Sequence, residues 1–466
     1  MKLPRYPSYK PSGAKWLGDV PEHWRVKAIK WESPVLRGAS PRPIDNDIYF
    51  DDEGEHAWVR IADVTSAGMY LHETTQRLSE LGRSLSVPLQ PGALLLSIAG
   101  SVGKACIAAI KCCIHDGFVH FPFWNGDARF LYYLFASGEP YKGLGKLGTQ
   151  LNLNTDTVGS IVAGFPTLQE QRAIADFLDA QTSKLDTLVV KKRELIEKLK
   201  EKRAALISRT VTRGLPPEAA RAAGLNPHPK LKPSGIEWLG DVPAQWRRTR
   251  IKFEAVVVSK GTTPFTVSKE LVNEGIRFLK AENIYDGKVL SNPEFYIDSE
   301  TDQLLARSRL KQDDVLIVIA GATTGKAAIL PRSLLPANTN QAVCFIRLSN
   351  TNYASILLAW ISTKFIQDII WNSAVQAAQP NLAMEDVKAF PCFVPPSQEQ
   401  RVVAAYLDRE TAKIDRMVAK IEAAIEKLQE YRTALITAAV TGKIDVRTQP
   451  IENRSSEALS AANHLA

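Results

Sequence analysis

Two stretches of the chain place an apolar residue at every seventh position, and the rest of the sequence is arranged around them. The first stretch runs from Gln169 to Arg213 and the second from Gln398 to Gly442, so matched positions lie 229 residues apart. A seven-residue apolar repeat that lasts four heptads is typical of a coiled-coil seam. The predicted seam residues are Leu178, Leu185, Leu199, Leu206, Leu407, Ile414, Ile421, Leu428 and Leu435.

A second row of residues is predicted beside each seam. In the second stretch it lies three positions after the seam residues, and in the first stretch two leucines flank the seam. Lys192 takes the seam position that Ile421 fills in the other copy. This lysine could reach out to solvent, mark the register of the helix pair or face a bound partner, and the sequence leaves these options open. The predicted row residues are Glu410, Met417, Ala424, Tyr431 and Ala438, with Leu188 and Leu195 in the first stretch.

Both stretches carry the signals of a long helix. A helix over residues 169–209 would be about 60 Å long at 1.5 Å per residue, which exceeds an ordinary globular helix. Because one helix cannot bury its own seam, we expect the two helices to pair within the chain. The start and stop signals are the capping-box pairs Thr167–Glu170 and Ser397–Gln400 and the terminal glycines Gly214 and Gly442.

A sixteen-residue motif opens each half of the chain. Residues 10–25 read KPSGAKWLGDVPEHWR and residues 232–247 read KPSGIEWLGDVPAQWR, with twelve identical positions. We call these segments the tryptophan motifs. The internal repeat therefore includes more than the helices. We expect the motif tryptophans to pack into cores, and these are Trp16, Trp24, Trp238 and Trp246.

The bodies between each tryptophan motif and each long helix are less alike. Both contain an apolar run, LLLSIAG at 94–100 and VLIVIAG at 315–321, which predicts a buried strand that ends in a glycine turn. A Gly-Lys pair follows each run. We infer a duplicated scaffold whose working faces have diverged, so that the bodies bind two different ligands or two parts of one ligand.

These patterns divide the chain into six predicted segments. The linker between the halves is rich in Pro, Ala and Gly, which is typical of an exposed connection. The end of the chain from Arg447 is polar and without periodicity, and we expect it to be poorly ordered. The segments are a first body at 1–165, a first long helix at 166–213, the linker at 214–231, a second body at 232–394, a second long helix at 395–442 and a tail at 443–466.

Composition and charge narrow the class of protein. The 466 residues are 45% hydrophobic, with a net charge of +8 and a pI of about 9.1, and a basic balance favours a polyanionic partner. No run of eighteen apolar residues and no apolar leader occurs, so we expect no membrane partner and a cytoplasmic location. The cysteines show no framework spacing, which fits reduced thiols. No metal site is predicted, because Cys112, Cys113 and His115 lack the second half of such a site.

Two glycine-lysine turns resemble phosphate-binding loops. Residues 100–104 read GSVGK and residues 321–326 read GATTGK, and alanine follows the lysine in both. A nucleotide-binding loop requires GxxxxGK followed by Ser or Thr, so no nucleotide site is predicted. The turns are either purely structural or hold a DNA phosphate with glycine amides and a lysine. No catalytic residue is predicted anywhere in the chain.

Basic and amide side chains in predicted loops are candidate DNA contacts. Lysine and arginine neutralise phosphates, whereas Arg, Asn and Gln can read base edges in the major groove. Each one alone is most often a solvated surface group, but their presence on two diverged bodies favours sequence reading. The candidates are Arg60, Lys104, Lys111, Lys280, Asn283, Lys288, Arg309, Lys326, Asn340 and Gln341.

Taken in order, these features resemble the specificity (S) subunit family of type I restriction-modification systems. The resemblance spans nearly the whole chain. It rests on the duplicated tryptophan motif, the repeated IAG and GK words, and two long helices that each follow a variable body. It also includes the helix-start pattern of Pro166, Leu168, Glu170, Gln171 and Arg172, in whose second copy Gln398 replaces the leucine.

The resemblance implies an α+β fold in which two mixed α/β target recognition domains are joined by an antiparallel coiled coil of two long helices, with an internal pseudo-twofold repeat. Each domain would read one half of a bipartite double-stranded DNA target, and the coiled coil would set the spacer. Two modification subunits would methylate adenine at N6, and restriction subunits would translocate and cleave DNA. S-adenosylmethionine, ATP and Mg²⁺ would be bound by those partners, and this chain would hold no cofactor and no catalytic centre.

Two hypotheses from other classes stay open on the sequence alone. The chain could be an enzyme, a methyltransferase or nuclease, with an unrecognised site, in which case the isolated chain would show activity or a bound cofactor. It could instead be a coiled-coil interaction scaffold. Binding that ignores DNA sequence and disappears at modest salt would favour the scaffold, because nonspecific phosphate contacts depend strongly on salt.

Overall fold

A computed structural model describes residues 3–142, 144, 153–237, 239–285, 287–374 and 381–447. The chain divides into two compact units. The first unit contains Met1–Lys192 and Ala423–Ala466, and the second contains Arg193–Glu422. Each unit therefore combines one body with part of each long helix. Trp238 and the predicted tail beyond residue 447 lie outside the described residues.

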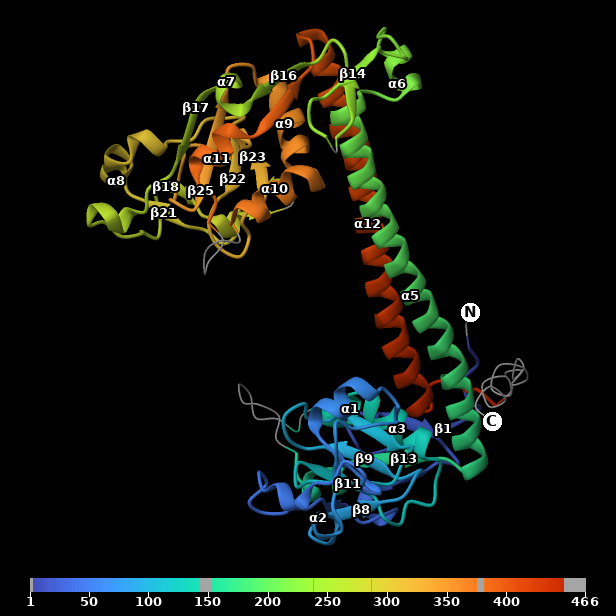
Figure 1. Ribbon diagram of the computed structural model, residues 1–466. Coiled ribbons are helices and arrows are strands. Elements are labelled where there is room, and N and C mark those ends of the chain that lie inside the picture. Colours follow the sequence, from blue (N-terminus) through green and yellow to red (C-terminus); the bar gives the residue numbers. More distant parts are fainter. Residues whose placement is uncertain are drawn as a thin grey trace. The chain divides into compact units, whose positions relative to one another are not determined.

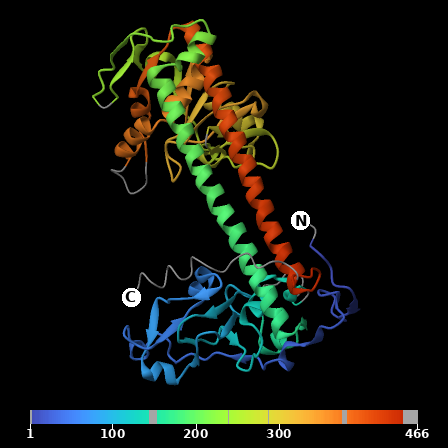
Figure 2. The same cartoon turned by 90° about the vertical axis from the view of Figure 1, so that its right-hand side faces the viewer.

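The two long helices are α5 (Leu168–Arg213) and α12 (Ser397–Val440), drawn in green and red (Figure 1). In the first unit the start of α5 packs against the end of α12, as the shared core of Leu178 and Leu435 shows. In the second unit the end of α5 packs against the start of α12, where Val211 shares a core with Val403. The helices are thus antiparallel, as the resemblance implied, and both views draw them next to each other (Figure 2).

The seam residues differ in how deeply they are buried. The most deeply buried seam residues lie near the two bodies. Lys192 is partly exposed, and its role in the seam stays open. The seam residues that are buried are Leu178, Leu407, Ile414 and Leu435, and those that are half-buried are Leu185, Leu199, Leu206, Ile421 and Leu428.

The row beside each seam differs from the prediction. Ile196 and Ile425 are buried, whereas Met417 and Tyr431 are 42% and 52% exposed. The row therefore lies four residues after the seam positions, and the prediction of a row three residues on is wrong. Apolar residues in a coiled coil are spaced alternately by three and four positions. Because both candidate rows contain some apolar residues, the sequence alone does not decide which row packs beside the seam. Leu188 and Leu195, which were predicted to flank the seam, are also exposed.

The first unit contains two main sheets. A five-stranded sheet has the order β4-β12-β9-β10-β6 and a four-stranded sheet has the order β7-β5-β11-β8. Its strands are β1 (Tyr9–Pro11), β2 (Asp19–Pro21), β3 (Arg25–Ala28), β4 (Leu36–Arg37), β5 (His56–Val59), β6 (Tyr70–Leu71), β7 (Gln76–Leu78), β8 (Val87–Leu89), β9 (Leu94–Ser97), β10 (Ala105–Ala108), β11 (Cys112–Ile114), β12 (Phe118–His120) and β13 (Val162–Phe165). Its shorter helices are α1 (Ile61–Ala67), α2 (Glu80–Ser84), α3 (Ala128–Ala136) and α4 (Thr155–Gly159).

The second unit repeats this plan with smaller sheets, in the orders β17-β25-β22-β23, β21-β18-β24 and β19-β20. Its strands are β14 (Leu231–Pro233), β15 (Asp241–Pro243), β16 (Arg247–Arg250), β17 (Ala255–Lys260), β18 (Ile276–Leu279), β19 (Ile284–Tyr285), β20 (Lys288–Val289), β21 (Tyr296–Ile297), β22 (Val315–Val318), β23 (Ala327–Ile329), β24 (Ala337–Thr339), β25 (Val343–Leu348) and β26 (Pro391–Val394). Its shorter helices are α6 (Pro217–Ala222), α7 (Ile251–Glu254), α8 (Ser299–Leu304), α9 (Ala354–Ile361), α10 (Lys364–Ala374) and α11 (Met384–Ala389).

The tryptophan motifs are anchored by the first turn of each long helix. Trp24 is fully buried and donates from Nε1 to Glu170 Oε1 at 3.1 Å. Trp246 is also fully buried and donates to Glu399 Oε1 at 3.0 Å. The expected core packing is confirmed for these two indoles, and Trp16 packs partly buried against the same core as Trp24. The repeated glutamate at the start of each long helix therefore belongs to the scaffold.

No helix within the described ranges is long and apolar enough to cross a membrane.

Candidate nucleic-acid interface

In the first unit, the candidate site begins where two parallel strands end. Strand β5 pairs in parallel with β11, with Val59 opposite Ile114. The carboxyl ends of parallel strands meet at one edge of a sheet, so Arg60 and His115 follow the two strands side by side. Arg60 is the cap of α1, and its backbone N–H donates to Asp63 Oδ2 at 2.8 Å. The Arg60 side chain is left exposed.

The glycine turn between β9 and β10 reaches the same edge. The N–H of Ile98, at the start of the turn, donates to the Gly117 carbonyl at 2.8 Å. Gly100 lies so close to α1 that a Cβ on it would stand 3.3 Å from Ile61. Lys104 ends the turn, with its N–H bonded to Ser97 Oγ at 3.0 Å and its side chain exposed. The structure therefore brings Arg60 and Lys104 together with His115.

The second unit builds the same arrangement from different residues. Strand β18 pairs in parallel with β24, with Leu279 opposite Thr339. Lys280 follows the first strand, and its N–H donates to Asn283 Oδ1 at 3.0 Å, as Arg60 bonds to Asp63. Asn340 follows the second strand, and its N–H donates to the Leu279 carbonyl at 3.2 Å. Lys280 and Asn340 therefore occupy the positions of Arg60 and His115 in the first unit.

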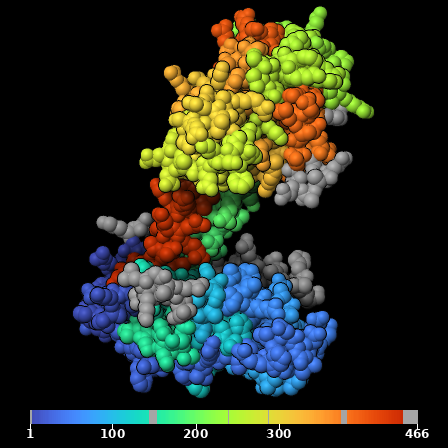
Figure 3. All heavy atoms as spheres, turned by 90° about the vertical axis from the view of Figure 1, so that its left-hand side faces the viewer, coloured from blue at the N-terminus to red at the C-terminus, as the bar shows by residue number. Residues whose placement is uncertain are grey.

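Three further cationic or amide groups gather near this second edge. Lys326 ends the glycine turn after β22, and its ammonium lies 5.7 Å from the centroid of the Tyr285 ring. Lys288 stands directly opposite Tyr285 in the β19–β20 pair and is exposed. Gln341 is exposed next to Asn340. Residues in this part of the sequence, yellow-green to yellow, form a broad area of the face of the second unit that Figure 3 shows.

His115 is the counterpart of Asn340 that sequence reasoning missed. Its Nδ1 accepts from the Gly117 N–H at 2.8 Å, just as Asn340 Oδ1 accepts from the Ala342 N–H at 3.2 Å. The sequence carries no signal for this match, because the residues after Ile114 share no identity with those after Thr339. Strand pairing shows the match, with Phe118 opposite Ser97 and Val343 opposite Val318. The prediction instead treated His115 only as a rejected metal ligand. Among the described residues no group of three or more His, Cys, Asp or Glu could hold a metal ion.

Electrostatics distinguish the two edges. Burial lowers the pKa of His115, and the nearby Arg60 charge lowers it further despite the opposing effect of Asp116. Burial would raise the pKa of Asp116, but a hydrogen bond from Ser40 and the charges of Arg37 and Arg42 lower it. The first edge therefore combines a neutral imidazole, a carboxylate and cations, whereas the second offers amides and lysines.

Three predicted contacts are placed elsewhere. Asn283 is fully buried, and its Nδ2 donates to the Leu290 and Pro293 carbonyls, so its side chain cannot reach a base edge in this conformation. Lys111 precedes β11 at the opposite sheet edge and is paired with Glu55. Arg309 lies just before Leu310, whose N–H donates to the carbonyl of Ala337 at the start of β24. The Arg309 guanidinium is paired with Asp302 at 2.7 Å. We therefore remove these three from the candidate site.

The remaining groups suit a nucleic acid. The exposed Arg60, Lys104, Lys288 and Lys326 can neutralise phosphates. Lys280 is half-buried, with its ammonium 3.4 Å from the centroid of the Phe295 ring and 4.0 Å from Glu282. His115, Asn340 and Gln341 have donors and acceptors of the kind that read base edges. In the glycine turn before each lysine, the backbone amides can come close to a phosphate. Each unit thus presents a cationic edge with one or two polar groups that differ between units.

A protein-family model described as the type I restriction modification DNA specificity domain matches residues 38–198 and 247–427. The chain belongs to this family. The two matches correspond to the two halves of the internal repeat, and each includes one candidate edge. The matched family is thus that of the DNA specificity domains of type I restriction-modification systems.

Individual relatives are distant. The type I restriction enzyme EcoBI specificity subunit of Escherichia coli is 23% identical over 304 residues, which cover 64% of this chain and 61% of that protein. The matched region thus spans less than two thirds of the curated relative.

Two solved structures share the fold. One, from work on complex assembly and conformational transition of the type I R-M system, has a TM-score of 0.65 at 14% identity and covers 90% of this chain and 98% of that chain. The HsdS subunit from Thermoanaerobacter tengcongensis has a TM-score of 0.51 at 16% identity and covers 91% and 98%. The predicted fold of two mixed α/β bodies and long helices is confirmed by these likenesses.

Proposed function

We propose that this subunit reads a bipartite double-stranded DNA target, with one half-site bound by each unit. The observation that carries the proposal is the repeated edge, in which Arg60 and Lys104 in one unit correspond to Lys280 and Lys326 in the other. The matched cations would position the phosphates of each half-site. The unmatched neighbours, His115 against Asn340, would give the two units different base preferences.

The long helices would set the distance between the half-sites. Two weak half-site contacts add when a linker of matching span holds both binding units. The continuity of α5 and α12 over 46 and 44 residues supports this role, because a helix of fixed length is a stiff spacer. The spacer between the half-sites would then be unread DNA.

The catalytic work would be performed by partner subunits. We propose that two modification subunits bind this chain and methylate adenine at N6 with S-adenosylmethionine. Restriction subunits would add ATP- and Mg²⁺-dependent translocation and cleavage. The supporting observation is family membership, together with the likeness to a structure solved in work on the assembly of a type I system.

A map of N6-methyladenine in genomic DNA would test this function. Cells with the gene are expected to carry a motif of two short words with a fixed gap, and cells without it are expected to lose that motif. Loss should be reversed by the intact gene on a plasmid. An unchanged map, with the modification subunit shown to be expressed and active, would contradict the proposal.

A further inference from the structure

Each unit exposes one large aromatic side chain at the same place in the repeat. Trp31 is 71% exposed and Phe253 is 69% exposed. Each lies seven residues after a buried tryptophan of the motif, Trp24 or Trp246. A single exposed aromatic needs no explanation, but these two rings occupy matched positions on two bodies that have otherwise diverged. Packing within the chain does not account for either ring.

The backbone that presents each ring is the same in both units. Trp31 follows strand β3, which pairs with β13, and Phe253 follows β16, which pairs with β26. The N–H of Ile29 donates to the Ile161 carbonyl at 2.9 Å, and the N–H of Ile251 donates to the Phe390 carbonyl at 3.1 Å. These two-stranded ribbons lead directly into α5 and α12. In each unit the ribbon is separate from the sheets that carry the candidate DNA edge.

A lysine stands beside each ring. The Lys30 ammonium is 5.7 Å from the Trp31 ring centroid, and the Lys252 ammonium is 5.0 Å from that of Phe253. We call these two pairs the lysine–aromatic knobs. A cation at this distance is attracted by the face of the ring. Each knob therefore combines an exposed aromatic ring with a positive charge.

Positive charge surrounds the first knob. Arg25 and Lys27 share a single carboxylate, Glu32, at 3.4 and 2.9 Å, so their charge is only partly balanced. Lys30 adds to this surplus. A partner surface with carboxylates around an apolar hollow would complement this knob.

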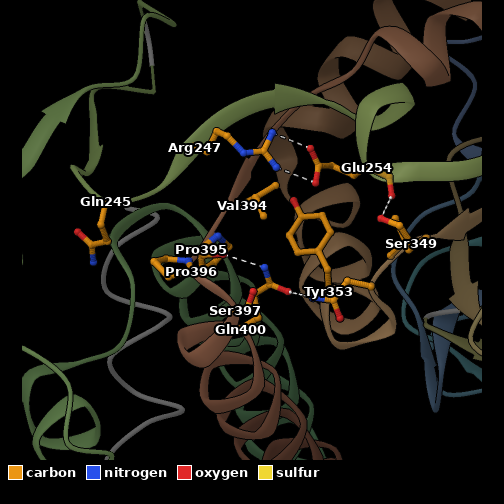
Figure 4. A pocket seen from close by; sticks show the side chains of 12 residues that line it. Gln245, Arg247, Glu254, Ser349, Tyr353, Val394, Pro395, Pro396, Ser397 and Gln400 are labelled. Atoms are coloured by element: carbon orange, nitrogen blue, oxygen red, sulfur yellow. Dashed lines mark hydrogen bonds and ion pairs between the residues drawn. The ribbon is translucent and has the colours of Figure 1, made fainter.

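The second knob has a similar charge surplus and lies next to a cavity. Arg247 pairs with Glu254 at 2.9 Å, while Arg250 and Lys252 add positive charge to the same ribbon. The cavity has a volume of about 400 Å³ and is lined by Arg247, Glu254, Tyr353 and the start of α12. Figure 4 shows the Arg247 guanidinium facing the Glu254 carboxylate beside the Tyr353 ring.

We propose that the two lysine–aromatic knobs are the docking points for two copies of one protein partner, one copy on each unit. This inference rests on the proposed function, and the partner is then the modification subunit. Aromatic side chains, including Trp and Phe, are enriched in protein interfaces, and tryptophan is among the residues that contribute most binding energy. The knobs are alike in the two units whereas the base-reading groups differ, which fits a partner that is identical on both sides and a DNA target that is not.

The test measures how many modification subunits the full chain binds, by analytical ultracentrifugation with the purified modification subunit. The unsubstituted chain is expected to bind two copies. Trp31→Ser and Phe253→Ser are each expected to weaken one site at least tenfold and leave the other unchanged. The double variant should bind neither copy at the concentration that saturates the unsubstituted chain.

Matched variants separate docking from folding. Trp31→Phe should keep both copies bound, because phenylalanine fills the same place in the second unit. Phe123→Ser and Phe265→Ser remove other exposed aromatics, one in each unit, and should bind two copies. Circular dichroism on all variants would verify that they fold.

Three outcomes would overturn the inference in different ways. A double variant that binds two copies with unchanged affinity would exclude the knobs as docking points and leave the proposed function intact. Unchanged partner binding with reduced affinity for DNA would assign the knobs to nucleic acid instead. If the unsubstituted chain binds no modification subunit, both this inference and the proposed assembly fail.

Discussion

In the second unit, Arg203 of one long helix donates from Nε to the carboxylate of Asp415 in the other, at 2.9 Å. The first unit contains the matching pair, in which Arg432 donates from Nε to Asp186 at 3.0 Å. The 229-residue offset of the repeat relates the two pairs, because Arg203 corresponds to Arg432 and Asp186 corresponds to Asp415. The antiparallel register of the helices is therefore marked twice by one kind of ion pair.

The first prediction concerns this register. Arg203→Asp should lower the free energy of unfolding by about 0.5–1 kcal/mol, the usual range for a partly exposed pair, because two carboxylates would then face each other. Adding Asp415→Arg should restore most of the loss. Denaturant unfolding of the single and double variants measures the coupling. Charge exchange at the exposed Lys200–Glu197 pair within α5 is the control, and equal coupling at both pairs would contradict a register role.

The second prediction concerns the buried carboxylate of Glu170. It accepts from Trp24 Nε1 and, at 2.7 Å, from the Tyr6 hydroxyl, and His23 lies within 2.9 Å. Glu170→Ala should lower the free energy of unfolding by roughly 2–4 kcal/mol, because buried donors would lose their acceptor. Chemical denaturation measures the change. The exposed Glu197→Ala serves as the control, and a similar small loss for both variants would disprove the anchoring role.

The third prediction concerns the turn lysines. Lys104→Ala and Lys326→Ala should each weaken DNA binding and reduce the slope of log K against log salt by about one, as loss of one phosphate contact does. The recognised sequence should not change. Lys111→Ala is the control, because Lys111 lies at the other sheet edge and is paired with Glu55. Salt titrations of the assembled complex measure the slopes, and an unchanged slope in both variants would leave the turns purely structural.

The fourth prediction concerns spacing. A heptad inserted after Ile196 in α5 and a matched heptad after Glu422 in α12 would lengthen each helix by about 10 Å at 1.5 Å per residue. The spacer in the methylated motif should then grow by about three base pairs at 3.4 Å per pair. Methylation mapping reads the spacer directly. The two half-site words should stay the same, and an unchanged spacer in a folded variant would rule out the helices as the measuring element.

The fifth prediction concerns pH. Burial lowers the pKa of His115 below its usual value near 6.5. Below about pH 6.5 the unfolded chain binds a proton at this residue that the folded chain does not, so stability falls as the pH is lowered from 7.5 to 5.5. His115→Gln should show a smaller fall. Thermal unfolding across that range is the measurement, with the exposed linker variant His228→Gln as the control.

The sequence alone determined the long helices, the internal repeat and the family. Seven-residue spacing is a property of the chain itself, and the motif around Trp24 and Trp246 is visible in the sequence as twelve identical positions. Only the tertiary structure decided which row flanks the seam, since a step of three and a step of four each place some apolar and some polar residues there. Ile196 and Ile425 settle the choice by their burial.

The candidate site also required the fold. Asn283 and Asn340 look alike in sequence, but one is buried as a loop support and the other follows a strand at the open edge. Lys104 and Lys111 are seven residues apart, yet they precede strands of two different sheets, β10 and β11. Sequence supplies the chemical groups, and strand pairing between distant segments determines which of them meet.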